Sequence, residues 1–214
     1  MVTGHPADAG FTVWLTGLSG SGKSTIARGL ATRIAERGHR VEILDGDEVR
    51  TNLSAGLSFT KEDRDANVGR IGWVCELLSR NGVVAIAAAI SPYRAARDEV
   101  RARIGRFVEI HVDASLEALE TRDSKGLYRR AREGALTGLT GVDDPYEPPE
   151  RPELTIRTDG PETAEASVDR IVVRLEELSY LAPATPAPQA AADAAYTEDE
   201  ESEVTDRLRD LGYL

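Results

Sequence analysis

The sequence predicts an α/β protein in which a parallel β-sheet carries helices on both faces. Apolar runs rich in β-branched residues alternate along the chain with stretches of helical spacing, as expected for parallel strands joined by helices. Polar and glycine-rich clusters follow the ends of the predicted strands, the edge at which such sheets bind ligands. The 214 residues suffice for one sizeable α/β domain and an appendage.

Five strands and five helices are expected, in alternation. The strands are predicted from the runs FTVWLT (11–16), VEIL (41–44), VVAIAAAI (83–90), FVEIHVD (107–113) and LTI (154–156). The helices are predicted near 23–37, 61–80, 93–104, 115–122 and 162–179.

The first strand runs into a glycine-rich loop, GLSGSGKST (17–25). The spacing Gly17-x4-Gly22-Lys23-Ser24 matches the phosphate-binding loop, in which backbone N–H groups surround an anion and a helix begins directly afterwards. A glycine-rich turn is the alternative. The pattern indicates a sheet of the P-loop NTPase type, with Lys23 on the terminal phosphates and Ser24 on Mg²⁺. The residues expected to bind the phosphates of ATP or GTP here are Gly17, Leu18, Ser19, Gly20, Ser21, Gly22, Lys23, Ser24 and Thr25.

The second strand ends in two carboxylates, Asp45 and Asp47, on either side of Gly46. Next to a phosphate loop they suit Mg²⁺ coordination or proton abstraction from an attacking hydroxyl, although an Asp-Gly turn has the same appearance. Arg50 and Arg64 follow. Each is a candidate for bidentate binding of sulfate or phosphate, or else a solvated surface cation.

Residues 121–150 form a long, charged and glycine-punctuated segment with few apolar anchors. Such a segment in a compact domain is usually functional or disordered. Its cations suggest a lid that covers anionic substrates and becomes ordered when they bind, and a solvated helix face is the alternative. The five cations are Arg122, Lys125, Arg129, Arg130 and Arg132.

Composition divides the chain and excludes several functions. We expect a flexible N-terminus (1–10), a domain (11–179), a Pro/Ala-rich linker (180–196) and an acidic amphipathic tail (197–214) that docks on a basic surface of an unknown partner or a neighbouring subunit. The net charge of −11 argues against general nucleic-acid binding. No secretory signal or membrane-length apolar run is present, so a cytoplasmic location is expected. The single cysteine, Cys75, is expected in the core and provides neither a disulfide nor a zinc site.

From about residue 11 to 178 the chain resembles the adenylylsulfate kinase family. The resemblance is carried by TVWLTGLSGSGKSTIA, LDGDEVR, LSFTKEDRDANVGRIG, ISPYRAARD, RDSKGLYRRAREG and TGVDDPYEPP, in the order and spacing of that family. It implies transfer of the γ-phosphate of ATP, with Mg²⁺, to the 3′-hydroxyl of adenosine 5′-phosphosulfate (APS), giving PAPS. A homodimer is left open.

The resemblance also implies roles for individual residues. Asp45 prepares the acceptor hydroxyl and shares the metal with Ser24, Lys23 acts on the transferring phosphate, and Arg122 is assigned to the nucleotide. Phe59 stacks on the acceptor's adenine. The acceptor is expected to contact Asp47, Arg50, Phe59, Arg64, Asn67, Ile90, Ser91, Lys125 and Leu139.

The chain departs from the family pattern at Ala89 and Leu139, both usually Phe, and at Glu48, Ala66 and Gly69. Leu139 removes one face of an aromatic clamp. A kinase of the same architecture acting on another small nucleotide-linked acceptor therefore stays open. The appended acidic tail leaves a third function open, that of a nucleotide-binding regulatory or scaffold protein.

Overall fold

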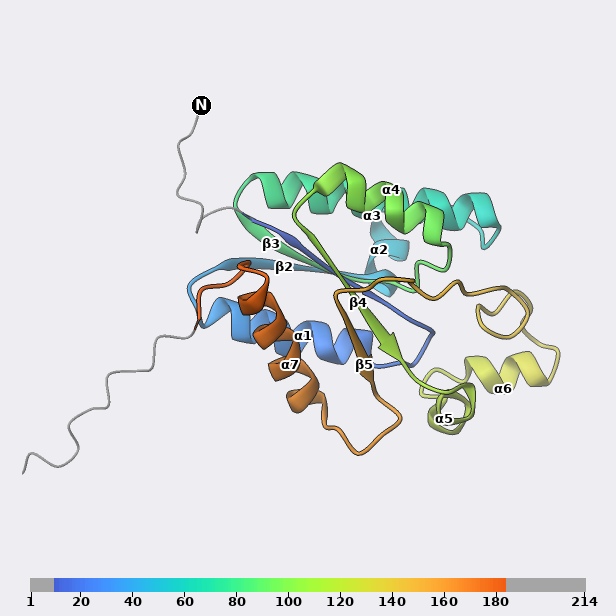
Figure 1. Cartoon of the computed structure of the whole chain (residues 1–214). Helices are drawn as coiled ribbons and strands as arrows, with labels where there is room; N and C mark the ends of the chain where they lie inside the picture. Colours follow the sequence, from blue (N-terminus) through green and yellow to red (C-terminus); the bar gives the residue numbers. More distant parts are fainter. Residues whose placement is uncertain (1–9, 184–214) are drawn as a thin grey trace, which may run out of the picture. The chain divides into compact units, whose positions relative to one another are not determined.

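The computed structural model describes residues 10–183 and confirms the predicted α/β class. Figure 1 shows a parallel sheet between two layers of helices, with the strands in the order β2-β3-β1-β4-β5. The strands are β1 (Thr12–Thr16), β2 (Arg40–Asp45), β3 (Val83–Ala88), β4 (Phe107–Asp113) and β5 (Leu154–Arg157).

Side chains of successive strand residues enter two separate apolar clusters, because their Cβ atoms alternate between the faces of the sheet. Val13 and Leu15 of β1 pack with α1 and α7, whereas Trp14 packs with α3 and α4. Cys75 is fully buried in the second cluster, as predicted. The helices are α1 (Lys23–Ala35), α2 (Gly46–Asn52), α3 (Lys61–Arg80), α4 (Arg94–Ile104), α5 (Leu116–Arg122), α6 (Leu127–Arg132) and α7 (Ala164–Glu177).

Two short helices, α2 and α6, were not predicted. Helix α2 buries only Val49, so seven residues give too little apolar periodicity to reveal it. Asp45 caps it by accepting a hydrogen bond from the N–H of Asp47 at 3.1 Å. The side chains that follow β2 are therefore fixed by a helix rather than carried on a loop.

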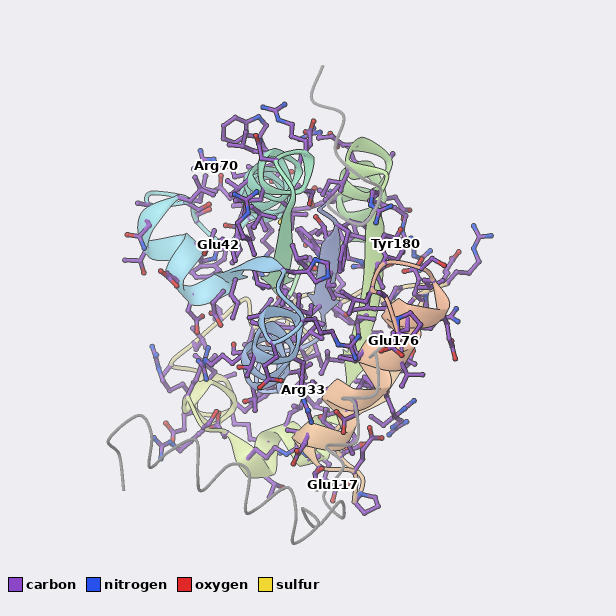
Figure 2. All side chains as sticks on the ribbon, turned by 90° about the vertical axis from the view of Figure 1, so that its left-hand side faces the viewer. Arg33, Glu42, Arg70, Glu117, Glu176 and Tyr180 are labelled. Carbon is purple, nitrogen blue, oxygen red and sulfur yellow. The ribbon has the colours of Figure 1, made fainter. Side chains whose placement is uncertain are left out.

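Helices α1 and α7 lie side by side on one face of the sheet, as Figures 1 and 2 show. Ion pairs join them: Arg33 to Asp169 at 3.1 Å and Arg37 to Glu176 at 2.7 Å. The packed chain continues past residue 179, where the sequence placed the end of the domain, because Leu181 is 3% exposed in the same core.

A compact unit ends at Ala182. The predicted acidic tail (197–214), nearly all of the linker and the predicted flexible N-terminus up to residue 9 lie outside the described residues. Within residues 10–183, no helix has both the length and the apolar character needed to span a membrane.

Candidate active site

A cavity of about 670 Å³ lies at the carboxyl edge of the sheet. The phosphate loop lines one part of it, and α2, the start of α3, the loop after β3 and the segment after α6 line the rest. Most of the residues expected from the sequence are brought together here: Ser19, Gly20, Gly22, Lys23, Ser24, Thr25, Asp45, Asp47, Arg50, Phe59, Arg64, Asn67, Ile90, Ser91, Lys125 and Leu139. Gly17, Leu18, Ser21 and Arg122 lie outside this lining.

The phosphate loop has the backbone conformation that its glycines predict. Gly22 caps α1 with a φ of 98°, a left-handed conformation that favours glycine. At Gly17 a Cβ would stand 2.1 Å from the carbonyl oxygen of Val112, so no larger residue fits between β1 and β4. The N-terminus of α1 therefore opens directly onto the cavity, where it favours an anion.

Lys23 is the buried cation of this loop, with only 9% of its surface exposed. Its Nζ donates to the carbonyl oxygens of Gly17 at 2.8 Å and Leu18 at 2.7 Å. Burial, followed by the nearby charge of Lys125, lowers the pKa of the Lys23 ammonium to about 7. The side chain is thus held in place to meet a phosphate but carries only a partial charge near neutral pH.

Asp45 at the end of β2 and Asp47 in α2 line the same cavity as Lys23, close enough for their charges to raise its pKa. Asp47 forms an ion pair with Lys125, which comes from the segment between α5 and α6. A hydroxyl at Ser24 and carboxylates at Asp45 and Asp47 are hard oxygen donors of the kind Mg²⁺ prefers. Within residues 10–183 no group of three or more His, Cys, Asp or Glu side chains is placed to hold a metal. Mg²⁺ bound with a nucleotide needs only one or two protein carboxylates beside the phosphates, so the residues present fit it.

Phe59 and Asn67 lie farther along the cavity wall. Phe59 is 62% exposed, and the guanidinium of Arg50 sits over its ring at 4.4 Å from the centroid. Asn67 is 8% exposed, yet its Oδ1 has no hydrogen-bond partner among the described residues. A buried amide without a partner in the chain is a natural contact for a ligand.

Ser91 borders the cavity, but its hydroxyl points into the protein. It accepts a hydrogen bond from Trp14 Nε1 at 3.0 Å and donates one to Thr16 at 3.1 Å. Its backbone has a φ of 42°, unusual for a residue other than glycine. Only the wall formed by Ser91, and not its hydroxyl, is available to a substrate.

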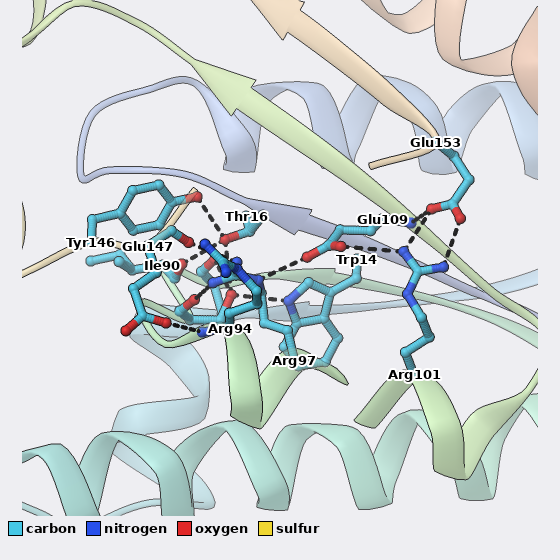
Figure 3. Close-up of polar contacts among 12 residues, drawn as sticks. Trp14, Thr16, Ile90, Arg94, Arg97, Arg101, Glu109, Tyr146, Glu147 and Glu153 are labelled. Atoms are coloured by element: carbon cyan, nitrogen blue, oxygen red, sulfur yellow. Dashed lines mark hydrogen bonds and ion pairs between the residues drawn. The ribbon is translucent and has the colours of Figure 1, made fainter. Parts of the chain in front are cut away.

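The end of the lid is tied to this same network. The hydroxyl groups of Tyr146 and Thr16 lie 3.0 Å apart, and Thr16 directly precedes the phosphate loop. Arg97 is 1% exposed and donates to Glu109 and to the carbonyl oxygens of Ser91 and Glu147 (Figure 3). The base of the phosphate loop, the cavity wall at Ser91 and the end of the segment 121–150 are therefore fixed relative to one another.

The few apolar residues of the lid pack into one cluster with apolar residues just before it in the chain, which the sequence did not predict. Leu139, Leu119, Tyr128 and Ala114 form a buried cluster of their own. Tyr128 also donates from its hydroxyl to the Ser19 carbonyl oxygen at 2.8 Å, which joins α6 to the phosphate loop. The apolar residues of the segment are few, but they converge from α5, α6 and the following turn.

The five lid cations do not share one function. Among the described residues that line the cavity, Lys125 is the one member of the set. Arg132 pairs with Glu120, and Arg129 and Arg130 lie on the exposed surface of α6. Arg122 bonds to Thr158, whose hydroxyl donates to the carbonyl oxygen of Ser21 at 3.0 Å. Arg122 is thereby linked to the phosphate loop through one intermediate residue, Thr158.

Several residues that shape the site were not identified from the sequence. Thr16, Tyr128, Thr140, Asp144, Tyr146 and Thr158 all act through contacts with residues far away in the chain. Tyr128 offered a weak signal, as an aromatic residue inside a run of cations. The remaining five look like ordinary turn or strand residues.

A phosphate loop after β1, carboxylates after β2 and a lid over one cavity define a P-loop phosphotransferase. The family model for adenylylsulphate kinase matches residues 9–157, and the chain belongs to that family. The adenylyl-sulfate kinase of Rippkaea orientalis is 58% identical over 173 residues, which cover 81% of this chain and 95% of that protein.

Solved structures of APS kinases are also similar to this chain. The Mycobacterium tuberculosis APS kinase CysC in complex with AMPPNP and APS is 39% identical with a TM-score of 0.75, covering 78% of this chain and 98% of that one. The hexameric APS kinase of Thiobacillus denitrificans is 42% identical with a TM-score of 0.63. It covers 82% of this chain, which spans 31% of that longer one.

Proposed function

We propose that this chain transfers the γ-phosphate of ATP to the 3′-hydroxyl of APS and so forms PAPS and ADP. The observation that carries the proposal is the composition of one cavity. It has a phosphate loop at one side and, at the other, a buried amide oxygen with no hydrogen-bond partner within residues 10–183, an aromatic ring and cations. A donor and an acceptor nucleotide can therefore meet there with their reacting groups between Lys23 and Asp45.

In the proposed reaction the chain positions two substrates and neutralises charge. Asp45 accepts the proton of the 3′-hydroxyl while the oxygen of that hydroxyl bonds to the γ-phosphorus. The bond from that phosphorus to the bridging oxygen breaks, and the electron pair leaves with ADP. Lys23 donates hydrogen bonds to the oxygens of the phosphate while it is transferred. Mg²⁺, held by Ser24 and Asp45, would supply positive charge to the phosphate oxygens.

On the acceptor side, Asn67 is positioned to bind the nucleotide through its free amide, and Phe59 to stack on the base. Arg50 and Lys125 provide cations for the phosphosulfate. For Lys125 this requires its ion pair with Asp47 to exchange for the substrate. Ile90 and the backbone of Ser91 close the pocket beside them.

The test is phosphorylation of APS by the full chain with MgATP, followed as ADP release and as PAPS. A panel of other nucleotide acceptors is run in parallel, and Lys23→Ala serves as the inactive control. PAPS formation that depends on Lys23 is expected. If PAPS fails to form at millimolar APS while another nucleotide is phosphorylated readily, the acceptor is a different one, as Leu139 in place of an aromatic residue would allow. The mass of the purified protein in solution tests whether it forms a homodimer.

A further inference from the structure

Arg64 has an unusual set of contacts for a residue expected to bind the acceptor's anion. It is 6% exposed, and four of its five N–H groups have acceptors among the described residues. Nε donates to the Phe59 carbonyl oxygen at 2.7 Å, and Nη1 to Thr140 Oγ1 at 2.6 Å. Nη2 donates to the Gly138 carbonyl oxygen and to Asp144 Oδ2, each at 2.7 Å.

These acceptors lie on two sides of the cavity. Phe59 forms one wall, and the segment from Gly138 to Thr140, which includes Leu139, forms the wall contributed by the lid. A guanidinium is planar and rigid, so bonds from it to both walls fix the distance between them.

We infer that Arg64, held by Asp144 and Thr140, is a positioning residue that sets the width of the pocket for the acceptor's base. The inference rests on the proposed function, because it assigns the space between Phe59 and Leu139 to that base. We call the set Phe59, Arg64, Gly138, Thr140 and Asp144 the Arg64 latch.

Asp144 is the part of the latch that balances the buried charge. A cation as buried as Arg64 is stable only with a paired, hydrogen-bonded partner. A tight turn returns Asp144 to the guanidinium: the Gly141 N–H donates to the Asp144 carbonyl oxygen at 2.7 Å, and the Asp143 N–H donates to that of Leu139 at 3.0 Å. The shape of the turn thus depends on the Arg64–Asp144 pair, and the place of Leu139 depends on the turn.

The latch and a direct anion-binding role for Arg64 predict opposite effects of Asp144→Asn. If Arg64 bound the phosphosulfate directly, loss of the competing carboxylate would leave APS binding unchanged or tighter. If Arg64 sets the pocket width, the same change loosens the lid wall and weakens APS binding.

The experiment measures the KM values for APS and ATP in the full chain. We expect the KM for APS to rise roughly tenfold in Asp144→Asn and a few-fold in Thr140→Val, since each removes a partner of a buried cation. The KM for ATP and the kcat at saturation should stay within about twofold of wild type. Glu153→Gln is the matched control: it weakens a half-buried ion pair with Arg101, whose Nη1 lies 2.6 Å from Glu153 Oε1, away from the cavity lining, and should change neither KM. An unchanged or lower KM for APS in Asp144→Asn, or an equal rise in both KM values, overturns the inference.

Hydrogen exchange tests the latch without reference to activity. Asp144→Asn should accelerate exchange in residues 139–144 and also in residues 57–60, because Arg64 joins the two segments. Glu153→Gln should accelerate neither. If the wild-type protein does not phosphorylate APS, the proposed function fails, yet exchange still decides whether the latch exists. Acceleration on one side alone, or on neither, refutes it.

Discussion

Above pH 7, nucleotide binding should take up a proton, because Lys23 is then mostly neutral in the free protein and becomes charged when a phosphate binds. With a pKa of about 7 in the free protein, about nine in ten Lys23 side chains are uncharged at pH 8. The phosphates of ATP favour the ammonium and raise its pKa toward the ordinary lysine value of 10.5.

The magnitude follows from that difference. Above about pH 7.5 the terminal phosphate of ATP is already ionised. In that range the Kd for MgATP should rise about tenfold per pH unit. Calorimetry at about pH 8 in buffers of different ionisation enthalpy should show an uptake of roughly 0.9 proton per bound nucleotide. Lys125→Met removes the second cause of the low pKa, so it should shift the whole effect to higher pH.

The stability of the unliganded protein should increase with pH, whereas the affinity for MgATP decreases. The folded-state pKa of Lys23 lies below its unfolded value, so the unfolded chain binds more protons between about pH 7 and pH 10.5. Through this group the free energy of unfolding rises with pH across that window, by at most about 1.4 kcal/mol per pH unit. The difference from Lys23→Met isolates the effect in urea denaturation. Absence of proton uptake at pH 8, together with parallel stability profiles for the two proteins, would refute the argument.

Four other changes test separate parts of the structure. Asp45→Asn should lower kcat about 10²–10⁴-fold without lowering Tm, because Asn also caps a helix; near-normal turnover would contradict the role of the carboxylate. Leu139→Phe should lower the KM for APS by roughly 5- to 150-fold, since one base–aromatic stack contributes roughly 1–3 kcal/mol, and an unchanged KM would place the base elsewhere. Arg97→Met should reduce the free energy of unfolding by about 3 kcal/mol in urea, because it leaves the buried carboxylate of Glu109 with one cation fewer; a smaller loss in Arg97→Lys would support that cause. Truncation after residue 183 should leave kcat and both KM values unchanged, and lost activity in a folded product would show that the tail takes part in the reaction.

The sheet and the outline of the cavity were predictable because they depend on local patterns. Apolar runs specify strands, and a parallel sheet brings the segments after its strands to one edge, so Lys23, Asp45 and Ser91 had to meet there. The glycines of the phosphate loop carry their backbone requirement in their identity. Helix α2 could have been anticipated from Asp45 and Glu48, which have the spacing of a capping box, but its single buried residue gave no periodicity.

The contacts that position the site were not predictable, because they join residues far apart in the chain. Arg64 finds its acceptors in the lid 74 to 80 positions later, and Ser91 meets Trp14 across 77 positions. Nothing in either local sequence indicates which way the side chain turns. The same limit applies to the lid: its charges are visible in the sequence, whereas the apolar cluster under them exists only once α5 and α6 have packed together.

Two buried polar residues at this site differ in whether their side chains already have hydrogen-bond partners among the described residues. Ser91 and Asn67 are 3% and 8% exposed, and both were expected to bind the acceptor. The hydroxyl of Ser91 accepts from Trp14 and donates its one hydrogen to Thr16, so it could donate to a ligand only by breaking a bond within the protein. The carbonyl oxygen of the Asn67 amide has no such partner among the described residues, and leaving it unpaired costs about 1–3 kcal/mol. A substrate that donates to it recovers that free energy, and for this reason Asn67, and not Ser91, is the buried group whose replacement should affect APS binding directly.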